Sequence, residues 1–218
     1  MDRTIAIGDI HGCFKTFAKL LLEVLHIHHT DQVYCLGDLV DRGPDSKSVI
    51  DFIVSLRKTG YSIHTLRGNH EQLMLNALDN DQSNDHWLVN GGAETLSSFG
   101  INHIAQLPES YLRFLKDTRH YIQTEECIFV HAGLNLLLDN PFADTETMLW
   151  DRKFQYDALK LGNRPIVHGH TPRRREYISG QPVAGSINID GGCVYPVFNH
   201  LVALDVGNQQ YYFQECVG

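Results

Sequence analysis

Long apolar runs, a net positive charge and paired cysteines are all missing from this sequence. No apolar run approaches the ~20 residues that a helix needs to cross a bilayer, so we expect no membrane-spanning segment. The formal net charge of −8 argues against a nucleic-acid partner, because binding to a phosphate backbone needs a basic face. The N-terminus has neither the basic n-region nor the apolar h-region of a signal peptide, which predicts a cytoplasmic protein.

The five cysteines are odd in number, scattered along the chain, and form no CxxC pair. A disulfide framework would need a paired set, so these residues are more typical of reduced thiols in a cytosol. The sequence also contains no repeat, low-complexity stretch or linker. With 218 residues, of which 43% are hydrophobic and 20% charged, it predicts a single globular domain that spans residues 1–218 and makes no membrane contact.

Strand and helix patterns alternate in the first third of the chain. Short apolar runs predict strands at 4–7, 32–36 and 61–66. Apolar residues at helical spacing predict helices at 14–25, 48–56 and 70–78. Three successive βα units predict a parallel sheet with right-handed crossovers.

The middle of the chain, residues 79–124, is less regular. It contains a polar loop at 79–85, a turn at 90–92 and a helix from 108 to 115, and we interpret it as an insertion over the sheet edge. Two further predicted strands, at 127–130 and 164–167, end on histidines. In the tail, turn residues separate four predicted antiparallel strands, at 176–179, 186–189, 201–206 and 210–214.

Five loops that contain glycine and polar side chains follow predicted strands. They are Gly8-Asp9-Ile10-His11-Gly12, Gly37-Asp38-Leu39-Val40-Asp41-Arg42-Gly43, Gly68-Asn69-His70-Glu71, His131-Ala132-Gly133 and His168-Gly169-His170. Ligands of open α/β sheets bind at the carboxyl ends of the strands, where such loops lie. Because carboxylates, imidazoles and amides are metal donors, the five loops together predict one dinuclear metal site.

Taken alone, each loop also has a structural interpretation. Asp9 and His11 would point to one side of an extended chain and form half of a metal site, but the same pattern occurs in solvated loops. Asp38 is suited to bridging two cations and Arg42 to binding a phosphoryl group, whereas an Asp–Arg salt bridge in a turn is the alternative. Asn69 is suited to donate its amide oxygen to a metal, or to cap a helix.

The five loops, in this order, resemble the signature of the PPP-type serine/threonine protein phosphatases among the calcineurin-like metallophosphoesterases, in particular the small bacterial and lambda-phage branch. Asn90-Gly91-Gly92 and Leu149-Trp150-Asp151-Arg152 are similar to further elements of that branch. The resemblance implies a four-layer α/β/β/α fold, with a central β-sandwich flanked by helices in place of a doubly wound sheet. The three βα units would then form part of one sheet, and the antiparallel tail much of the other.

The resemblance also implies a role for each residue of the loops. Two divalent cations would be held by six side chains, namely Asp9, His11, Asp38, Asn69, His131 and His170. Asp38 would bridge the cations, with Asp9 and His11 completing the first site. Substrate phosphate would be bound by Arg42, Asn69 and Arg152. His70 would be the general acid, oriented by Asp41, and no role is implied for His168.

Two such cations can share a water and lower its pKa toward ~7. The implied activity is in-line attack of the resulting hydroxide on phosphoserine or phosphothreonine in proteins, with phosphotyrosine and phosphohistidine left open. Mn²⁺ is the expected metal, with Fe or Zn²⁺ as alternatives. Phosphoproteins or phosphopeptides are the expected partners. No regulatory subunit is implied, since the chain is short and lacks the C-terminal tail of the eukaryotic branch.

Two other functions stay open at this point. A symmetrical dinucleoside tetraphosphate hydrolase shares most of these motifs. A binding or scaffold protein that has lost catalysis is the alternative from a different class.

Overall fold

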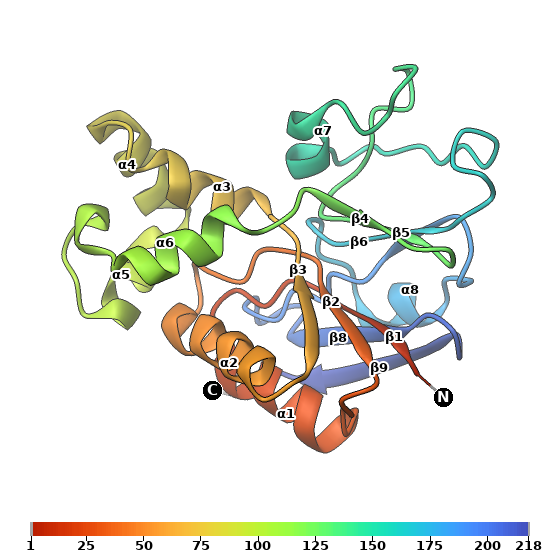
Figure 1. The fold of residues 1–218 in the computed structure, drawn as a ribbon, viewed down its shortest axis with the longest axis horizontal. Helices are drawn as coiled ribbons and strands as arrows, with labels where there is room; N and C mark the ends of the chain where they lie inside the picture. Colours follow the sequence, from red (N-terminus) through yellow and green to blue (C-terminus); the bar gives the residue numbers. More distant parts are fainter. Residues whose placement is uncertain (1, 218) are drawn as a thin grey trace.

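A computed structural model describes residues 2–217, and its strands form two β-sheets (Figure 1). The first sheet has the order β3-β2-β1-β8-β9, with strands Ser62–Thr65, Gln32–Cys35, Thr4–Ile7, His200–Asp205 and Gln210–Glu215. Strands β1, β2 and β3 are parallel, which confirms the predicted parallel sheet in the first third of the chain. β8 pairs antiparallel with β1, and β9 pairs antiparallel with β8.

The second sheet has the order β4-β5-β6-β7, with strands Tyr121–Gln123, Ile128–Val130, Ile166–His168 and Ser186–Asn188. Only its edge strand β4 runs antiparallel to its neighbour, whereas β5, β6 and β7 are parallel. The carboxyl ends of β5 and β6 therefore lie at one edge of the sheet, and His131 and His170 follow them.

Eight α-helices connect the strands within residues 2–217. They are α1 Phe14–Lys19, α2 Ser46–Lys58, α3 Asn69–Asn76, α4 Asp81–Trp87, α5 Ala93–Phe99, α6 Glu109–Lys116, α7 Thr145–Trp150 and α8 Arg175–Ser179. Shorter helical turns lie at Leu20–Val24 (η1), Leu88–Gly92 (η2) and Ile104–Gln106 (η3). In Figure 1, α1 and α2 lie beside the first sheet, and α3 to α6 gather next to them. In the part of the chain that the structure describes, no helix has the length and apolar character needed to span a membrane.

Successive side chains of a strand point to opposite faces of the sheet, so each strand contributes to the core on both sides. Ile5 and Ile7 pack in one buried cluster with side chains of α1 and α2, while Ala6 between them packs in the cluster that joins the two sheets. Across the sandwich, Tyr34 of β2 stacks on Phe129 of β5, with ring centroids 4.2 Å apart. A third cluster packs α7 against the outer face of the second sheet. Two sheets flanked by helices confirm the fold class expected from the resemblance.

The tail differs from its prediction in three respects. Residues 176–179 belong to helix α8, and β7 is parallel to its partner β6. β8 and β9 join the first sheet instead of forming much of the second. The reason is that Ile5, Ala6 and Ile7 of β1 are fully buried, so both edges of β1 need a hydrogen-bonded neighbour, and β8 supplies the second one.

The middle segment is also more helical than predicted. The polar run at 79–85 contains the start of α4, where the Asn80 side chain accepts a hydrogen bond from the backbone N–H of Ser83 (2.9 Å). Its polar composition hid the helix, because Trp87 is its only buried residue. The turn expected at 90–92 is a kink between helical segments, with Gly91 at φ 107°. The helix expected at 108–115 is confirmed as α6.

Candidate metal centre

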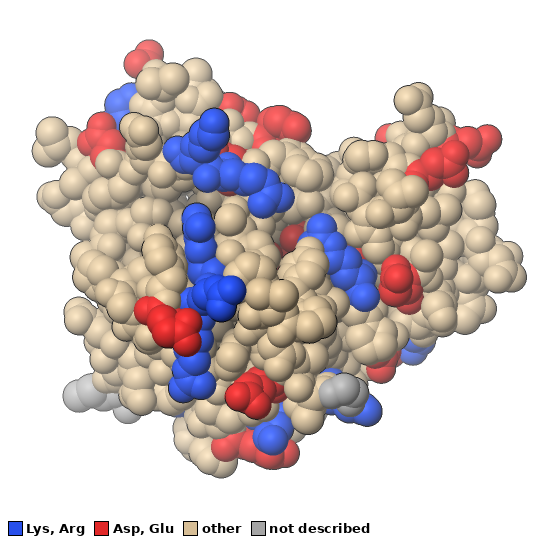
Figure 2. All heavy atoms as spheres, turned by 180° about the vertical axis from the view of Figure 1, so that it is seen from behind, with Lys and Arg blue, Asp and Glu red and all other residues tan. Residues whose placement is uncertain are grey.

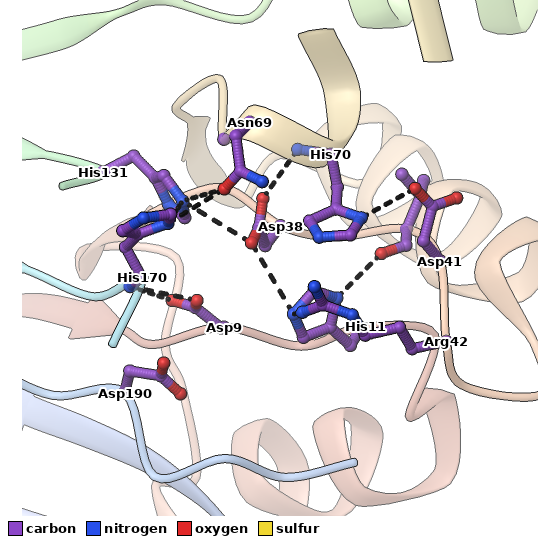
Figure 3. A network of polar contacts seen from close by, with 12 residues as sticks. Asp9, His11, Asp38, Asp41, Arg42, Asn69, His70, His131, His170 and Asp190 are labelled. Carbon is purple, nitrogen blue, oxygen red and sulfur yellow. Dashed lines mark hydrogen bonds and ion pairs between the residues drawn. The ribbon is translucent and has the colours of Figure 1, made fainter. Parts of the chain in front are cut away.

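The loops after β1, β2, β3, β5 and β6 converge on the carboxylate of Asp38 (Figure 3). The six predicted metal-binding side chains are all at most 5% exposed: Asp9, His11, Asp38, Asn69, His131 and His170. The structure therefore brings together residues that lie up to 161 positions apart in the sequence.

Asp38 lies between two groups of donors. Its Oδ2 is 3.6 Å from Nε2 of His11 on one side and 3.5 Å from Nε2 of His131 on the other. Its Oδ1 accepts a hydrogen bond from the backbone N–H of His70 (3.0 Å). The carboxylate is thus fixed in orientation, with one oxygen facing both groups.

Three donors face Asp38 from the second sheet and from α3. Nε2 of His131 is 3.0 Å from Oδ1 of Asn69 and 3.2 Å from Nδ1 of His170, and this Nδ1 is 2.9 Å from Oδ1 of Asn69. Metal–ligand bonds of ~2.1 Å place the ligands of one ion roughly 3 Å apart, so this spacing fits a shared cation.

The tautomers of two histidines suit metal binding. Nδ1 of His11 is 3.0 Å from the carbonyl oxygen of Val40, and Nδ1 of His131 is 3.0 Å from the carbonyl oxygen of Leu36. A carbonyl oxygen only accepts, so the proton of each ring is on Nδ1 and the lone pair of Nε2 points inward. Lone pairs of His131, Asn69 and Asp38 then face one another, and a cation between them relieves the repulsion.

Three buried carboxylates strengthen the case for cations. Burial raises the pKa of Asp9 well above its usual value, and the neighbouring charges of Asp190 and Asp38 raise it further. Burial likewise raises the pKa of Asp190 to about 7. Burial alone would raise the pKa of Asp38 too, but the imidazoles of His131, His70 and His11 lower it below its usual value. Divalent cations stabilise the charged form of all three carboxylates.

Asp190 was not predicted as a site residue, although it lies beside Asp9 (Figure 3). It follows β7, and its Oδ1 accepts a hydrogen bond from the backbone N–H of Gly192 (2.8 Å). Its place directly after an apolar strand, in Ile189-Asp190-Gly191, is the same kind of signal that identified Asp9.

The conformation of the first loop differs from the one assumed for it. His11 has φ 46°, so Asp9 and His11 do not share a face of an extended strand, and that reason for pairing them was wrong. Asp38, Asp41, Arg42 and His170 also have φ between 47° and 70°. Such conformations are strained for residues other than glycine and concentrate at functional sites.

Two glycines make room for the buried carboxylates. A Cβ on Gly68 would lie 2.1 Å from Oδ1 of Asp38, and a Cβ on Gly169 would lie 2.0 Å from Oδ1 of Asp9. Any side chain at either position would displace a carboxylate, so these glycines fix the shape of the site.

Glu71 holds the central loop from behind. Its carboxylate accepts hydrogen bonds from the backbone N–H groups of Asp38 (2.8 Å), Leu39 (2.7 Å), Val40 (3.3 Å) and Gly68 (2.7 Å). Burial raises the pKa of Glu71 to about 7. The sequence motif includes this residue but did not reveal its positioning role, because its partners are backbone atoms of another loop.

His70 points away from the Asn69 side chain and toward Asp41. Its Nδ1 donates to Oδ2 of Asp41 (2.8 Å), and its Nε2 is buried without a hydrogen-bond partner. Burial opposes charge on this ring, yet Asp38 and Asp41 raise the pKa of His70 above its usual value. A protonated imidazole with a free Nε2–H can donate a proton.

Asp41 is itself held by the middle segment. Trp87 Nε1 donates to both of its oxygens (3.0 Å each), and Thr95 Oγ1 donates to Oδ1 (2.7 Å). Neither residue could be recognised from the sequence, since a tryptophan and a threonine in an irregular segment carry no motif. Helices α4 and α5 therefore position a site residue and do more than cover a sheet edge.

Two predicted phosphate-binding arginines lie at the rim. Nη1 of Arg42 is 2.8 Å from Nε2 of His11, and its guanidinium lies over the ring of Tyr195 (5.6 Å to the centroid). Arg152 is exposed, and its Nη1 lies 3.5 Å from Oγ1 of Thr171. Arg42 thus reaches the donor cluster directly, whereas Arg152 approaches it from solvent.

Ligand atoms gather in three groups within residues 2–217, with atoms of each group within 4.8 Å of one another. Two share Asp38, one with His11 and His70 and the other with His131 and His170. Asp9 is in neither group; its carboxylate accepts from the backbone N–H of His170 (3.0 Å).

The third group shows that the cysteines are less scattered than their sequence positions suggest. All five are free thiols, but Cys13, Cys193 and Cys216 meet in space.

A two-sheet α/β fold with such a donor cluster at its strand ends defines a candidate metal-binding protein. The sequence model of the calcineurin-like phosphoesterase family matches residues 3–202 of this chain. The chain therefore belongs to the calcineurin-like phosphoesterase family, whose members bind a dinuclear metal centre.

Known relatives include two kinds of phosphoesterase. Serine/threonine-protein phosphatase 1 of Salmonella typhimurium is 40% identical over 87% of this chain and 86% of its own length. An asymmetrical bis(5′-nucleosyl)-tetraphosphatase of Geobacillus thermodenitrificans is 27% identical over 87% of this chain and 85% of its own length. A symmetrical bis(5′-nucleosyl)-tetraphosphatase of Erwinia tasmaniensis is 43% identical, but over only 33% of this chain and 25% of its own length.

Solved structures support the fold. A structure described as a putative diadenosine tetraphosphatase superposes with a TM-score of 0.69 at 22% identity, covering 100% of this chain and 95% of the other. A protein serine/threonine phosphatase of Saccharomyces cerevisiae superposes with a TM-score of 0.66 at 16% identity, covering 100% and 81%.

Proposed function

We propose that this phosphoesterase hydrolyses phosphoserine and phosphothreonine in proteins or peptides, through one catalytic domain that uses two divalent cations. The observation that carries this proposal is the pair of His70 and Asp41. Nδ1 of His70 is bound by Asp41 at 2.8 Å, and its Nε2 has no partner. A serine alkoxide is a poor leaving group that needs a proton, and this pair is arranged to supply one.

The donor set fits two cations. Asp9, His11 and Asp38 would hold the first, and Asn69, His131 and His170 would hold the second with Asp38 shared. When bound, such cations neutralise phosphoryl charge and lower the pKa of the attacking water. Oxygen and imidazole donors without thiolates suit Mn²⁺, and Fe or Zn²⁺ are also compatible with them.

Side chains of the protein bind the phosphoryl group and supply the proton for the leaving group. Arg42 and Arg152 bind the phosphoryl oxygens, where negative charge grows in the transition state. The amide N–H₂ of Asn69 would donate to the same phosphoryl group. His70 gives the proton on Nε2 to the departing serine or threonine oxygen, and Asp41 keeps the other ring proton on Nδ1.

Hydrolysis of dinucleoside tetraphosphates is the second candidate. It is supported by the bis(5′-nucleosyl)-tetraphosphatase from Geobacillus thermodenitrificans, which aligns along most of both chains. The relative of higher identity over a similar span is the serine/threonine-protein phosphatase from Salmonella typhimurium, and this favours the first candidate. A nucleotide leaving group also departs more readily than an alkoxide, so it has less use for the His70–Asp41 pair.

A parallel assay tests the proposed function. With Mn²⁺ supplied, kcat/KM on a phosphoserine peptide should exceed kcat/KM on a dinucleoside tetraphosphate. The reverse order would assign the site to the second candidate. Inactivity on both substrates and on p-nitrophenyl phosphate, in a folded sample with bound metal, would leave a binding or scaffold role.

Removing either arginine should weaken the binding of the phosphoryl group and lower kcat/KM, while the metal content stays the same. A charge-assisted hydrogen bond contributes roughly 1.5–3 kcal/mol, so Arg42→Ala and Arg152→Ala should each lower kcat/KM by more than about tenfold. Arg42→Ala should have the larger effect, because Arg42 is half-buried and held against Tyr195 while Arg152 is exposed.

The matched control for the arginines is Arg174→Ala, which removes an exposed positive charge. Inhibition by inorganic phosphate should weaken in the two variants and stay unchanged in the control. If phosphate inhibited all four proteins equally, the proposed phosphate contacts would be wrong.

A further inference from the structure

A polar cavity of about 120 Å³ adjoins the candidate metal centre. Its lining includes Arg152, Thr171, Arg173, His168, Asn188 and Asp151. Thr171 directly follows His170, and Nη1 of Arg152 lies 3.5 Å from Oγ1 of Thr171. One of the proposed phosphate-binding arginines therefore belongs to both the catalytic site and this cavity.

Arg173 is the unusual residue of the cavity. Its backbone N–H donates to the carbonyl oxygen of Asp190 (2.9 Å), which fixes the chain at this point. Its guanidinium lies over the ring of Tyr177, 5.2 Å from the centroid, and its Nε is buried without a hydrogen-bond partner. A buried N–H on a charged group is costly to leave without an acceptor, so this geometry fits an anion in the cavity.

The other walls are fixed and mostly neutral. Nε2 of His168 lies 3.0 Å from Oγ of Ser186, and its Nδ1 lies 3.3 Å from the carbonyl oxygen of Gly169. Nδ2 of Asn188 donates to the carbonyl oxygens of Gly169 (3.3 Å) and Thr171 (3.1 Å). Asp151 is the one carboxylate on the lining, and its Oδ1 accepts from the backbone N–H of Lys153 (2.8 Å).

Two guanidinium groups thus oppose one carboxylate in the cavity. On the scale of the whole molecule, Lys and Arg side chains gather around a hollow on one face, with an acidic side chain at its floor (Figure 2). This arrangement contrasts with the formal net charge of −8 and concentrates positive potential around that hollow.

We propose that the cavity is a second anion subsite, in which Arg173 binds a further phosphoryl group of the substrate while Arg152 lies between the two groups. The proposal rests on the proposed function, since it extends the same site to substrates with more than one phosphate. The shared chemistry is a second phosphoryl group, and its source is either a neighbouring phosphorylated residue of a peptide or the polyphosphate chain of a dinucleotide.

A binding experiment tests the subsite. Calorimetry in saturating Mn²⁺ compares AMP with its triphosphate analogue, adenosine 5′-(β,γ-imido)triphosphate. Both probes carry adenosine, and the analogue has two more phosphoryl groups and an imido bridge between the last two. Phosphate released from AMP is measured in the same samples, so that binding is evaluated on intact AMP. We expect the analogue to bind wild-type protein at least about tenfold more tightly than AMP, because one more charge-assisted contact contributes about that factor.

Matched variants assign this difference to Arg173. Arg173→Gln should bring the affinity of the analogue close to that of AMP and leave the affinity for AMP unchanged. Arg174→Gln removes the same charge from the adjacent, exposed residue and should keep the difference. Equal effects of the two variants would indicate long-range charge alone and overturn the subsite, as would an unchanged difference in Arg173→Gln.

If Arg173→Gln does not fold, Arg173→Lys serves in its place, because it keeps the charge but lacks Nε–H. It should lose part of the difference, and full retention would overturn the contact to Nε.

Kinetics identify the source of the second phosphoryl group. Relative to p-nitrophenyl phosphate, Arg173→Gln should lower kcat/KM about tenfold or more on a doubly phosphorylated peptide or on a dinucleoside tetraphosphate, whichever the subsite accepts. A loss of the same size on p-nitrophenyl phosphate would overturn the subsite. Since the calorimetry does not depend on turnover, a protein that binds as expected but hydrolyses nothing would disprove the proposed function and leave the subsite standing.

Discussion

Replacing Asp38 by asparagine should nearly abolish activity at limiting Mn²⁺. Oδ2 of Asp38 is the one oxygen that faces both His11 (3.6 Å) and His131 (3.5 Å), so its charge would serve both cations. Metal ions contribute several kcal/mol of charge stabilisation in the transition state, and each ~1.4 kcal/mol is a factor of ten, so turnover should fall roughly 10³-fold. Elemental analysis of the same samples should show that both metals bind more weakly.

The control for this experiment is Asp9→Asn, which removes a buried carboxylate from one side of the site only. It should weaken the binding of one metal ion and reduce activity less than Asp38→Asn does. Circular dichroism would check that both variants keep the secondary structure of the wild type. Two tightly bound metals per chain and wild-type turnover in Asp38→Asn would rule out the bridging role.

His70→Asn should lower turnover in proportion to the leaving group's need for a proton. General acid catalysis contributes typically ~10²–10⁴-fold, so a loss in that range is expected on a phosphoserine peptide. On p-nitrophenyl phosphate the loss should be distinctly smaller, because p-nitrophenolate leaves without help. The metals should remain bound, since Asp41 holds Nδ1 of His70 and orients the ring away from the Asn69 side chain.

Two variants of the surrounding network refine this test. Asp41→Asn should show the same leaving-group selectivity more weakly, because Asp41 only orients the ring. Trp87→Phe removes one donor to Asp41 and keeps an aromatic ring, so its effect should be smaller still. If His70→Asn lowered turnover equally on both substrates, or lost metal, His70 would be a metal ligand instead of the general acid. Its ring nitrogens lie close enough to His11 and Asp38 for that role.

The convergence of the site could be predicted because strand ends are visible in the sequence. Asp9, Asp38, Asn69, His131 and His170 each follow a short apolar strand, and parallel neighbours bring such ends to one edge. The directions of Asn69 and His70 also followed from their adjacency on one helix. The conformation of the loops could not be predicted, because the positive φ of His11 depends on contacts with distant segments.

The supporting residues of the site could not be recognised from the sequence, because they belong to no motif or act on backbone atoms. Thr95 and Trp87 bind Asp41 from helices whose composition is polar or irregular, and Glu71 acts on backbone atoms. The placement of β8 and β9 was missed for a different reason. A strand's pattern of buried residues shows that it needs neighbours but not which ones. Here β8 joined the open edge of β1, and β9 paired with β8.

Metal content and activity measured on one sample decide whether the donor cluster is a catalytic metal centre. A chelator should remove the metal and the phosphopeptide hydrolysis together, and activity should return as Mn²⁺ is restored, reaching its maximum near two ions per chain. Full activity in protein that elemental analysis shows to be free of metal would rule out a catalytic metal centre.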